Sequence, residues 1–131
     1  MAYLIDTDWA INALAGRNPA ANTLRRLTPL GLSVSLISAA EMYDVAFNSP
    51  NPEAHLARSR RFLRDFQILG LNDQIAERFA ETRAFLRRRG LLITDLDLLI
   101  AATALHYDLT LLTFNVAHFQ RIPEIRVYQP S

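Results

Sequence analysis

The sequence contains no cysteine and no lysine, and its four glycines are scattered along the chain. Without cysteine, disulfides and thiolate metal sites are excluded. Scattered glycines form no phosphate-binding loop, which argues against a nucleotide-binding Rossmann domain. No apolar run approaches the roughly 20 residues that a membrane span needs. The first apolar run meets Asp6 too early for a signal peptide, so we expect a cytoplasmic protein with no membrane partner.

The 131 residues suit one domain, and we expect a single unit over residues 1–131. The net charge of +1 hides an uneven distribution, because all 14 basic residues are arginine. Seven of these arginines lie in two clusters: Arg58, Arg60, Arg61 and Arg64, and then Arg87, Arg88 and Arg89. Arginine suits bidentate contacts with phosphate, although a solvated helix face explains both clusters equally well.

Short apolar segments alternate with helical patterns along the chain. We expect strands over residues 2–5, 32–36, 67–71, 110–113 and 126–128. We expect helices over residues 9–15, 18–27, 38–47, 53–66, 73–89, 94–106 and 116–121. This alternation predicts an α/β fold with a mainly parallel sheet that is covered on both faces. The helices on either side of the break at residues 48–52 should form a projecting helical hairpin.

The segment 94–105 begins with acidic residues and is then apolar on every side except at Thr103. A helix that is apolar all round lies inside a protein. A carboxylate that enters a core costs several kcal/mol unless a positive charge meets it, and the helix N-terminus supplies part of that charge. Thr94 and Asp97 also resemble a capping box, so capping explains Asp97 taken alone at least as well as a ligand role does.

Three acids and one amide follow the predicted strands. Asp6 ends the first strand, Glu41 opens the helix after the second, Asp97 begins the buried helix, and Asn115 follows the fourth strand. The carboxyl ends of parallel strands share one edge of the sheet, so these side chains should converge. Such hard oxygen ligands suit Mg²⁺ or Mn²⁺, which would also relieve the repulsion between the carboxylates. A metal held there would bind a phosphodiester and activate water.

Other polar residues near these positions leave alternatives open. Ser38 and Glu41 have the spacing of a capping box, and Asp8 is either an outer-shell ligand or the N-cap before Trp9. Asp95 lies two residues before Asp97 and should point to another helix face, as first-turn charge. No metal-ligand spacing relates the three histidines, which are His55, His106 and His118.

Four stretches together resemble the motifs of PIN-domain proteins. They are residues 4–8 (LIDTD), 37–42 (ISAAEM), 97–104 (DLLIAATA) and 112–119 (LTFNVAHF). Each motif is weak, but the four occur in order at compatible spacings, and the resemblance extends over the whole chain. Within the family, the sequence most resembles the VapC toxins of type II toxin–antitoxin systems. The resemblance implies a three-layer α/β/α sandwich with a mainly parallel central sheet and a helical hairpin.

The resemblance also implies an activity and partners. It implies a Mg²⁺- or Mn²⁺-dependent endoribonuclease toxin that cleaves structured RNA, such as tRNA or rRNA. It implies a homodimer that a VapB-type antitoxin neutralises. Contact with operator DNA would occur only through that antitoxin. The acidic positions of the family fall on Asp6, Glu41 and Asp97, which would bind metal and carry the reaction. The fourth position falls on Asn115, a departure that argues against a second tightly held ion, and Thr113 would orient water or phosphate.

Two further hypotheses compete with a ribonuclease. The chain could be a PIN-fold partner of a DNA-binding antitoxin that acts mainly in transcriptional autoregulation, with little nuclease activity. A weaker hypothesis is a phosphatase-like or flavodoxin-like small-molecule binder, which lacks the nucleophile context and the phosphate loop that we would require. Metal-dependent RNA cleavage that is lost on replacing Asp6 would separate the first hypothesis from both others.

Overall fold

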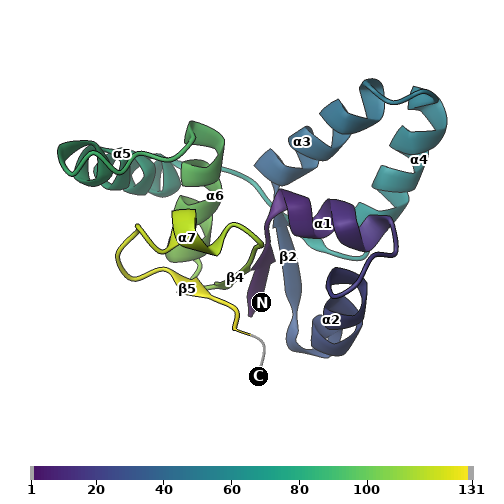
Figure 1. The fold of residues 1–131 in the computed structure, drawn as a ribbon, viewed down its shortest axis with the longest axis horizontal. Helices are drawn as coiled ribbons and strands as arrows, with labels where there is room; N and C mark the ends of the chain where they lie inside the picture. The colour runs from purple at the N-terminus through teal and green to yellow at the C-terminus, as the bar shows by residue number, and fades with distance from the viewer. Residues whose placement is uncertain (1, 130–131) are drawn as a thin grey trace.

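A sheet of five parallel strands forms the centre of the protein (Figure 1). The computed structural model describes residues 2–129. The strand order is β3 (Gln67–Leu69), β2 (Leu32–Ser35), β1 (Tyr3–Ile5), β4 (Thr110–Leu112) and β5 (Arg126–Val127). Every neighbouring pair of strands is parallel, which confirms the predicted α/β class.

Helices cover both faces of this sheet. They are α1 (Thr7–Leu14), α2 (Ala20–Leu27), the 3₁₀ helix η1 (Thr28–Leu30), α3 (Leu36–Phe47), α4 (Pro52–Leu63), α5 (Asp73–Arg88), α6 (Asp95–His106) and α7 (Val116–Phe119). One hydrophobic core contains residues of α5, α6 and α7, and the other contains residues of α1 to α4. In Figure 1 these two groups of helices lie on the left and right of the strands. No helix within residues 2–129 is long and apolar enough to span a membrane.

The two central strands show how the sequence divides between the two cores. Leu4 and Leu111 point into the core beneath α5 and α6, whereas Ile5 and Leu112 point into the core beneath α1 and α3. Successive side chains of a strand face opposite sides of the sheet. A strand that is buried on both faces is therefore a continuous apolar run, as the sequence predicted here.

Helix α6 is the predicted buried helix. Ile100, Ala101, Ala102 and Ala104 are fully or almost fully buried in it. Its one polar interior residue, Thr103, donates its hydroxyl proton to the carbonyl oxygen of Leu99 at 2.8 Å, so no buried hydroxyl is left without a partner there.

The predicted helical hairpin consists of α3 and α4, which pack against each other and project away from the sheet (Figure 1). The start of α4 has the expected signals. The side chain of Asn51 accepts a hydrogen bond from the backbone N–H of Ala54 at 3.3 Å, and Pro52 occupies the first helical position.

The start of α3 differs from the prediction. The helix begins at Leu36, and its N-cap is Ser35, whose hydroxyl accepts from the backbone N–H of Ile37 at 3.1 Å. Ser38 and Glu41 therefore lie inside the helix, and the predicted capping box between them is wrong. Leu36 is apolar and directly follows the alternating apolar and serine residues of β2, which is why it was included in the predicted strand.

Two other helix starts also need correction. The N-cap of α1 is Asp6, so Asp8 lies in the first turn and is not the cap. Helix α2 begins after Pro19 without a side-chain cap, whereas we expected the helix to include residues 18 and 19. The side chain of Asn18 accepts from the backbone N–H of Asn22, one helical turn further on.

Candidate active site

Asp6 joins the sheet to α1 at the carboxyl edge of β1. Its backbone N–H donates to the carbonyl oxygen of Leu112 at 2.8 Å, which continues the β1–β4 pairing by one step. Its side chain is only 5% exposed. Oδ1 accepts from the backbone N–H of Thr7 at 2.9 Å, and Oδ2 accepts from the hydroxyl of Thr113 at 2.7 Å. Each carboxylate oxygen thus has one protein donor and keeps a lone pair for another ligand.

The surroundings of Asp6 disfavour its charged form. Its pKa is raised to about 6, mainly by burial and also by the neighbouring carboxylates of Asp97 and Asp8, against the hydrogen bonds from Thr113 and Thr7. Within residues 2–129, no arginine or histidine forms an ion pair with Asp6. A buried carboxylate with acidic neighbours and no cation is the electrostatic setting that a divalent cation would relieve.

Asp97 lies in the first turn of α6, near Asp6. Its backbone N–H donates to the hydroxyl of Thr94 at 3.3 Å, so the predicted cap is present. Burial raises the pKa of Asp97 and the Asp8 carboxylate adds to this, while a hydrogen bond with Thr94 and the nearby His118 lower it. Capping therefore accounts for Thr94, but it leaves the Asp97 carboxylate without a basic ion-pair partner in the described part of the chain.

Thr7 connects Glu41 to Asp6. While its backbone N–H binds Asp6, its hydroxyl donates to Oε1 of Glu41 at 2.6 Å and lies 2.9 Å from the hydroxyl oxygen of Ser38. Ser38 is one helical turn before Glu41 on α3, so both side chains reach the same threonine. The first helical residue after Asp6 thus holds the acid of α3 at the edge of the sheet.

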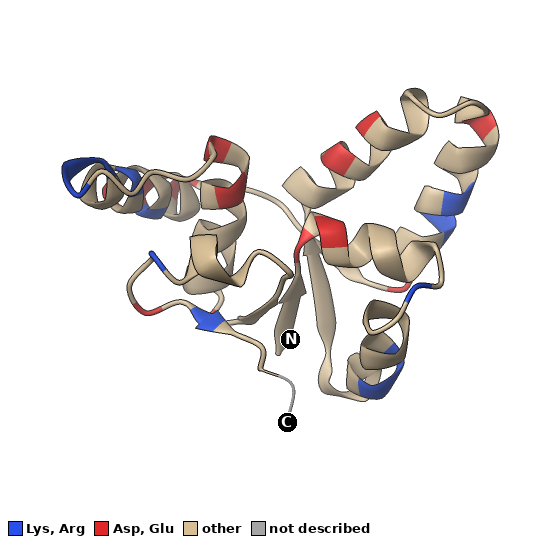
Figure 2. Cartoon of the chain, in the orientation of Figure 1, with Lys and Arg blue, Asp and Glu red and all other residues tan. Residues whose placement is uncertain are grey.

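Glu41 and Asp8 border a hollow of about 370 Å³ between α1, α3 and the start of α6. Acidic and apolar side chains line it together: Thr7, Asp8, Ile11, Ile37, Ala40, Glu41, Asp44, Val45 and Leu96. Figure 2 shows the acidic segments of α1, α3 and α6 around this part of the molecule. The hollow is therefore negatively charged with an apolar wall.

Asn115 lies at the same edge, in the loop between β4 and α7. Its backbone N–H donates to the hydroxyl of Thr113 at 2.9 Å, and its side-chain Nδ2 lies 2.7 Å from Nδ1 of His118. Thr113 thus contacts both Asp6 and Asn115. In this arrangement the hydroxyl of Thr113 holds Asp6 in place, while its role toward water or phosphate stays a prediction.

The structure brings the predicted site residues to one edge without closing them into a ligand cage. Asp97 lies near Asp6, Glu41 is joined to Asp6 through Thr7, and Asn115 is joined through Thr113. Among residues 2–129, no three histidine or carboxylate side chains form a group that could hold a metal ion. The oxygen donors and the unbalanced charge of Asp6 and Asp97 fit a divalent cation. The assignment of the individual ligands stays a prediction.

Sequence reasoning missed the contacts of Thr7 with Asp6, Glu41 and Ser38, and the stacking of Phe114 on Trp9. The hydroxyl groups sit directly after Asp6 and one helical turn before Glu41, which are spacings that allow contact with those acids. Phe114 is a large apolar residue between Thr113 and Asn115, in a loop where exposure is expected. These positions were visible in the sequence, but their contacts depend on how α1, α3 and β4 meet.

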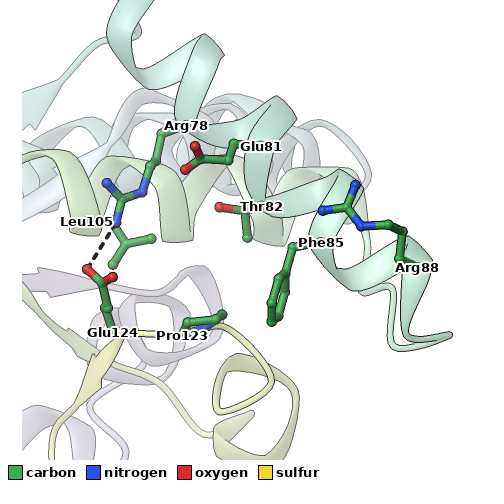
Figure 3. Close-up of a pocket in the computed structure, with 8 residues that line it drawn as sticks. All are labelled: Arg78, Glu81, Thr82, Phe85, Arg88, Leu105, Pro123 and Glu124. Carbon is green, nitrogen blue, oxygen red and sulfur yellow. Dashed lines mark hydrogen bonds and ion pairs between the residues drawn. The ribbon is translucent and has the colours of Figure 1, made fainter.

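A second hollow of about 240 Å³ lies at the other end of α6, and its lining residues are drawn in Figure 3. There Arg78 approaches Glu124, with 3.4 Å between Nη2 and Oε2, and Arg88 and Glu81 also line the wall. Equal numbers of basic and acidic residues line this hollow. It therefore lacks the unbalanced carboxylates that single out the edge near Asp6.

Comparison with known proteins agrees with this fold. Residues 3–125 match the model of the PIN domain family. Ribonuclease VapC2 of Rickettsia felis is 30% identical over 95% of this chain and 95% of the relative. The tRNA(fMet)-specific endonuclease VapC of Salmonella typhimurium is 28% identical over 97% and 96% of the two chains.

A solved structure is also similar, namely VapBC2 from Rickettsia felis bound to a DNA fragment from its promoter. The matched chain is 27% identical, the match covers 100% of both chains, and the TM-score is 0.92. The chain therefore belongs to the PIN-domain family, in its branch of VapC toxin ribonucleases.

Proposed function

We propose that the protein is a Mg²⁺- or Mn²⁺-dependent endoribonuclease toxin. The observation that carries this proposal is the environment of Asp6, a buried carboxyl with a pKa of about 6, acidic neighbours and no ion pair with a basic residue among residues 2–129. Charge left unbalanced at the carboxyl edge of a parallel sheet is typical of a functional site. The ribonuclease names of the VapC relatives support the same activity.

Asp6 and Asp97 would hold the metal ion, with Glu41 and Asn115 completing the site from α3 and from the loop before α7. When bound, the ion would neutralise phosphate charge and lower the pKa of a water molecule. Asn115 contributes a carbonyl oxygen without charge, so it would hold a second ion less strongly than an aspartate does. We therefore propose that any second ion arrives with the substrate phosphate.

The residues around these acids keep them in position. The hydroxyl of Thr113 and the backbone N–H of Thr7 fix both oxygens of Asp6, and the hydroxyl of Thr7 fixes Glu41. These side chains are already oriented by the fold, so metal and substrate binding would require little reordering. His118, beside Asn115 and near Asp97, adds an imidazole to this edge of the sheet.

The RNA backbone would lie along the arginines of α4. Arg58, Arg61 and Arg64 are exposed, and none of them forms an ion pair within residues 2–129. Arg60 differs, because its guanidinium lies 5.8 Å from the centre of the Tyr43 ring. Free guanidinium groups bind phosphate oxygens, and the counterions released on binding favour association. The substrate class that we propose is structured RNA, either tRNA or rRNA.

A VapB-type antitoxin would neutralise the enzyme at the hollow beside Glu41. Its apolar wall suits the apolar face of a peptide, and its acids suit an arginine or lysine of that peptide. Such a basic side chain would compete with the metal at Asp6, Glu41 or Asp97. Self-association as a homodimer stays a prediction from the resemblance.

The test is cleavage of tRNA and rRNA by the protein purified without an antitoxin, in Mg²⁺, in Mn²⁺ and in a chelator. We expect cleavage only with metal, and its loss in Asp6→Asn and Asp97→Asn, whose melting curves should show folded proteins. Asp95→Asn is the matched control, because Asp95 is on the same helix turn but pairs with Arg83. Full activity of Asp6→Asn, or cleavage in the chelator, would contradict the proposal.

Asn115→Asp tests the placement of the fourth residue. The added carboxylate should lower the Mg²⁺ concentration that half-maximal cleavage needs and should destabilise the metal-free protein near neutral pH. A Mg²⁺ titration of both variants at fixed RNA measures this. Identical Mg²⁺ dependence would mean that Asn115 points away from the metal.

A second candidate function is transcriptional autoregulation together with the antitoxin. The similar VapBC2 of Rickettsia felis, solved with promoter DNA, favours it. In that case the chain would act mainly as the antitoxin's partner on operator DNA. Absence of RNA cleavage under all metal conditions, with operator binding by the complex unchanged in Asp6→Asn, would favour this function over the first.

A further inference from the structure

Phe114 lies between Thr113 and Asn115 in the loop that joins β4 to α7. Its ring is 46% exposed, although burying a phenylalanine normally gains free energy. The hydroxyl of Thr113 donates to Asp6 at 2.7 Å and accepts from the backbone N–H of Asn115 at 2.9 Å. The residues on both sides of Phe114 are therefore tied to the candidate active site.

Trp9 supports the Phe114 ring. The two rings stack with 4.5 Å between their centres and 17° between their planes, and Trp9 is only 5% exposed. Nε1 of Trp9 is buried and has no hydrogen-bond partner among residues 2–129. The indole therefore contacts Phe114 through its ring face. Because Trp9 covers one face of Phe114, the exposed area of Phe114 is its other face and its edge.

We propose that Phe114, backed by Trp9, stacks an unpaired base of the RNA beside the scissile phosphate. This inference rests on the proposed ribonuclease function and adds a base-binding position to it. Proteins bind the splayed bases of RNA loops by stacking them on aromatic rings. Such stacking accepts every base, because each base has a π-face. The ring would thus fix a nucleotide relative to Asp6 without selecting its sequence.

A binding experiment tests the stacking directly. The parent is Asp6→Asn, which should bind RNA without cleaving it. The probes are short single-stranded RNAs that carry the fluorescent base 2-aminopurine at one position each, moved stepwise along the strand. Stacking on an aromatic ring quenches this fluorescence, so in the parent we expect quenching at one or two adjacent positions.

Three substitutions in that parent separate stacking from packing. Phe114→Leu keeps apolar cover over Trp9 but removes the ring. It should abolish the local quenching and weaken RNA binding by about 5- to 100-fold, the range for loss of one stacked base. Phe114→Trp should retain both. Phe47→Leu is the matched control, since Phe47 is 64% exposed at the far end of α3 and should leave RNA binding unchanged.

Cleavage kinetics give an independent readout with Asp6 restored. A base that stacks in both the ground state and the transition state contributes uniform binding, so Phe114→Leu should raise KM and leave kcat nearly unchanged. Phe47→Leu should change neither. Thermal melting of each variant confirms that the comparison is made between folded proteins.

Several outcomes would overturn the inference. Equal affinity and equal quenching in Phe114→Leu and its parent would mean that the ring only covers Trp9. Unchanged RNA binding together with weaker antitoxin binding would assign the ring to the antitoxin instead. If the wild type cleaves RNA and Phe114→Leu has the same KM, only the stacking is wrong. If the wild type neither binds nor cleaves RNA, the proposed ribonuclease function fails as well.

Discussion

The two ends of α6 face hollows in which charge is arranged differently. At the start of the helix, Asp97 lies near Asp6 and Asp8, and the pKa values of Asp6 and Asp97 are raised. At its end, Arg78 and Glu124 approach within 3.4 Å, so the two opposite charges compensate each other. The hollow at the start of the helix is about 370 Å³ and the one at its end about 240 Å³. Unbalanced negative charge distinguishes the two ends of α6, because folding alone gives no reason to bring like charges together.

The same contrast occurs within one helical turn. Asp95 and Asp97 are two residues apart at the start of α6, where acids are favoured by the helix dipole. Asp95 accepts a hydrogen bond from Nε of Arg83 at 2.8 Å and is mostly exposed. Asp97 turns toward the sheet edge and has no such partner in the described chain. The helix dipole and the ion pair with Arg83 therefore account for the acid at position 95. The unpaired carboxylate of Asp97 has no such structural reason, which favours a functional one.

The largest expected effect separates these two acids. Asp97→Asn and Asp6→Asn should each lower RNA cleavage by at least ~100-fold, because under the proposed function each would remove a metal ligand while keeping the side-chain shape. Asp95→Asn should stay within about twofold of the wild type, since only a surface ion pair is lost. Initial cleavage rates at saturating Mg²⁺ measure all three. Equal losses of cleavage rate in Asp95→Asn and Asp97→Asn would show that the two acids do not differ in function.

The next effect concerns stability against pH. The pKa of Asp6 is raised from 3.8 to about 6 in the folded protein, so folding is favoured while the group is protonated. The stabilisation is fully present below the unfolded pKa and is lost as pH rises through about 6. One pKa unit corresponds to about 1.36 kcal/mol. In metal-free buffer, the wild type should therefore lose about 3 kcal/mol between pH 3 and pH 7 that Asp6→Asn does not lose.

Urea unfolding of both proteins in a chelator, repeated across this pH range, gives that difference directly. Other titrating groups are common to the two proteins, and all except Asp97 and Asp8, whose carboxylates interact with Asp6, cancel in the comparison. Parallel stability curves would show that Asp6 is not desolvated in the metal-free protein.

A smaller effect tests the arginine cluster of α4. Replacing Arg58, Arg61 and Arg64 with glutamine should reduce the salt dependence of RNA binding by a slope of about 2, at roughly 0.7 for each lost phosphate contact on single-stranded RNA. The variant with Arg87, Arg88 and Arg89 replaced loses the same charge and serves as the matched control. Kd values over a salt series provide the slopes. Identical slopes for wild type and the α4 variant would assign that cluster to a solvated face or to the antitoxin.

The smallest expected effect concerns the ion pair of Arg78 and Glu124 in the hollow at the end of α6. A double-mutant cycle with Arg78→Gln and Glu124→Gln should give a coupling of at most about 0.5 kcal/mol in urea unfolding, because both side chains are substantially exposed. RNA cleavage should be unchanged in all three variants. A coupling of several kcal/mol, or a loss of cleavage, would break the contrast between the two ends of α6.

Much of the fold follows from patterns that the sequence displays directly. Apolar runs that alternate with helical periodicity indicate a parallel sheet covered on both faces. The all-apolar segment after Asp97 indicates a buried helix. Because parallel strands end at one edge, the positions of Asp6 and Asn115 along their strands were enough to place them together. Each of these inferences uses only local pattern and simple topology.

What the sequence could not settle depends on contacts between elements. The start of α3 was misplaced because Leu36 and Ile37 suit a strand as well as a helix, and Ser35 and Ser38 are both capable caps. Ser35 is the cap, and Ser38 instead contacts Thr7, which is 31 positions away in the sequence. The hydrogen bond between Thr113 and Asp6 likewise requires the register of β1 against β4, which no single segment encodes.

That hydrogen bond has a consequence for local opening of the sheet. Strands β1 and β4 are only three residues long each, and their backbone ladder ends where Asp6 N–H meets the carbonyl of Leu112. The hydrogen bond from Thr113 to Asp6 connects the two strands at the end of this ladder. Replacing the carboxylate should therefore make local opening of this edge more frequent. Hydrogen–deuterium exchange at the amides of Asp6 and Asn115 should then become faster at a lower degree of destabilisation than exchange within β1 and β4.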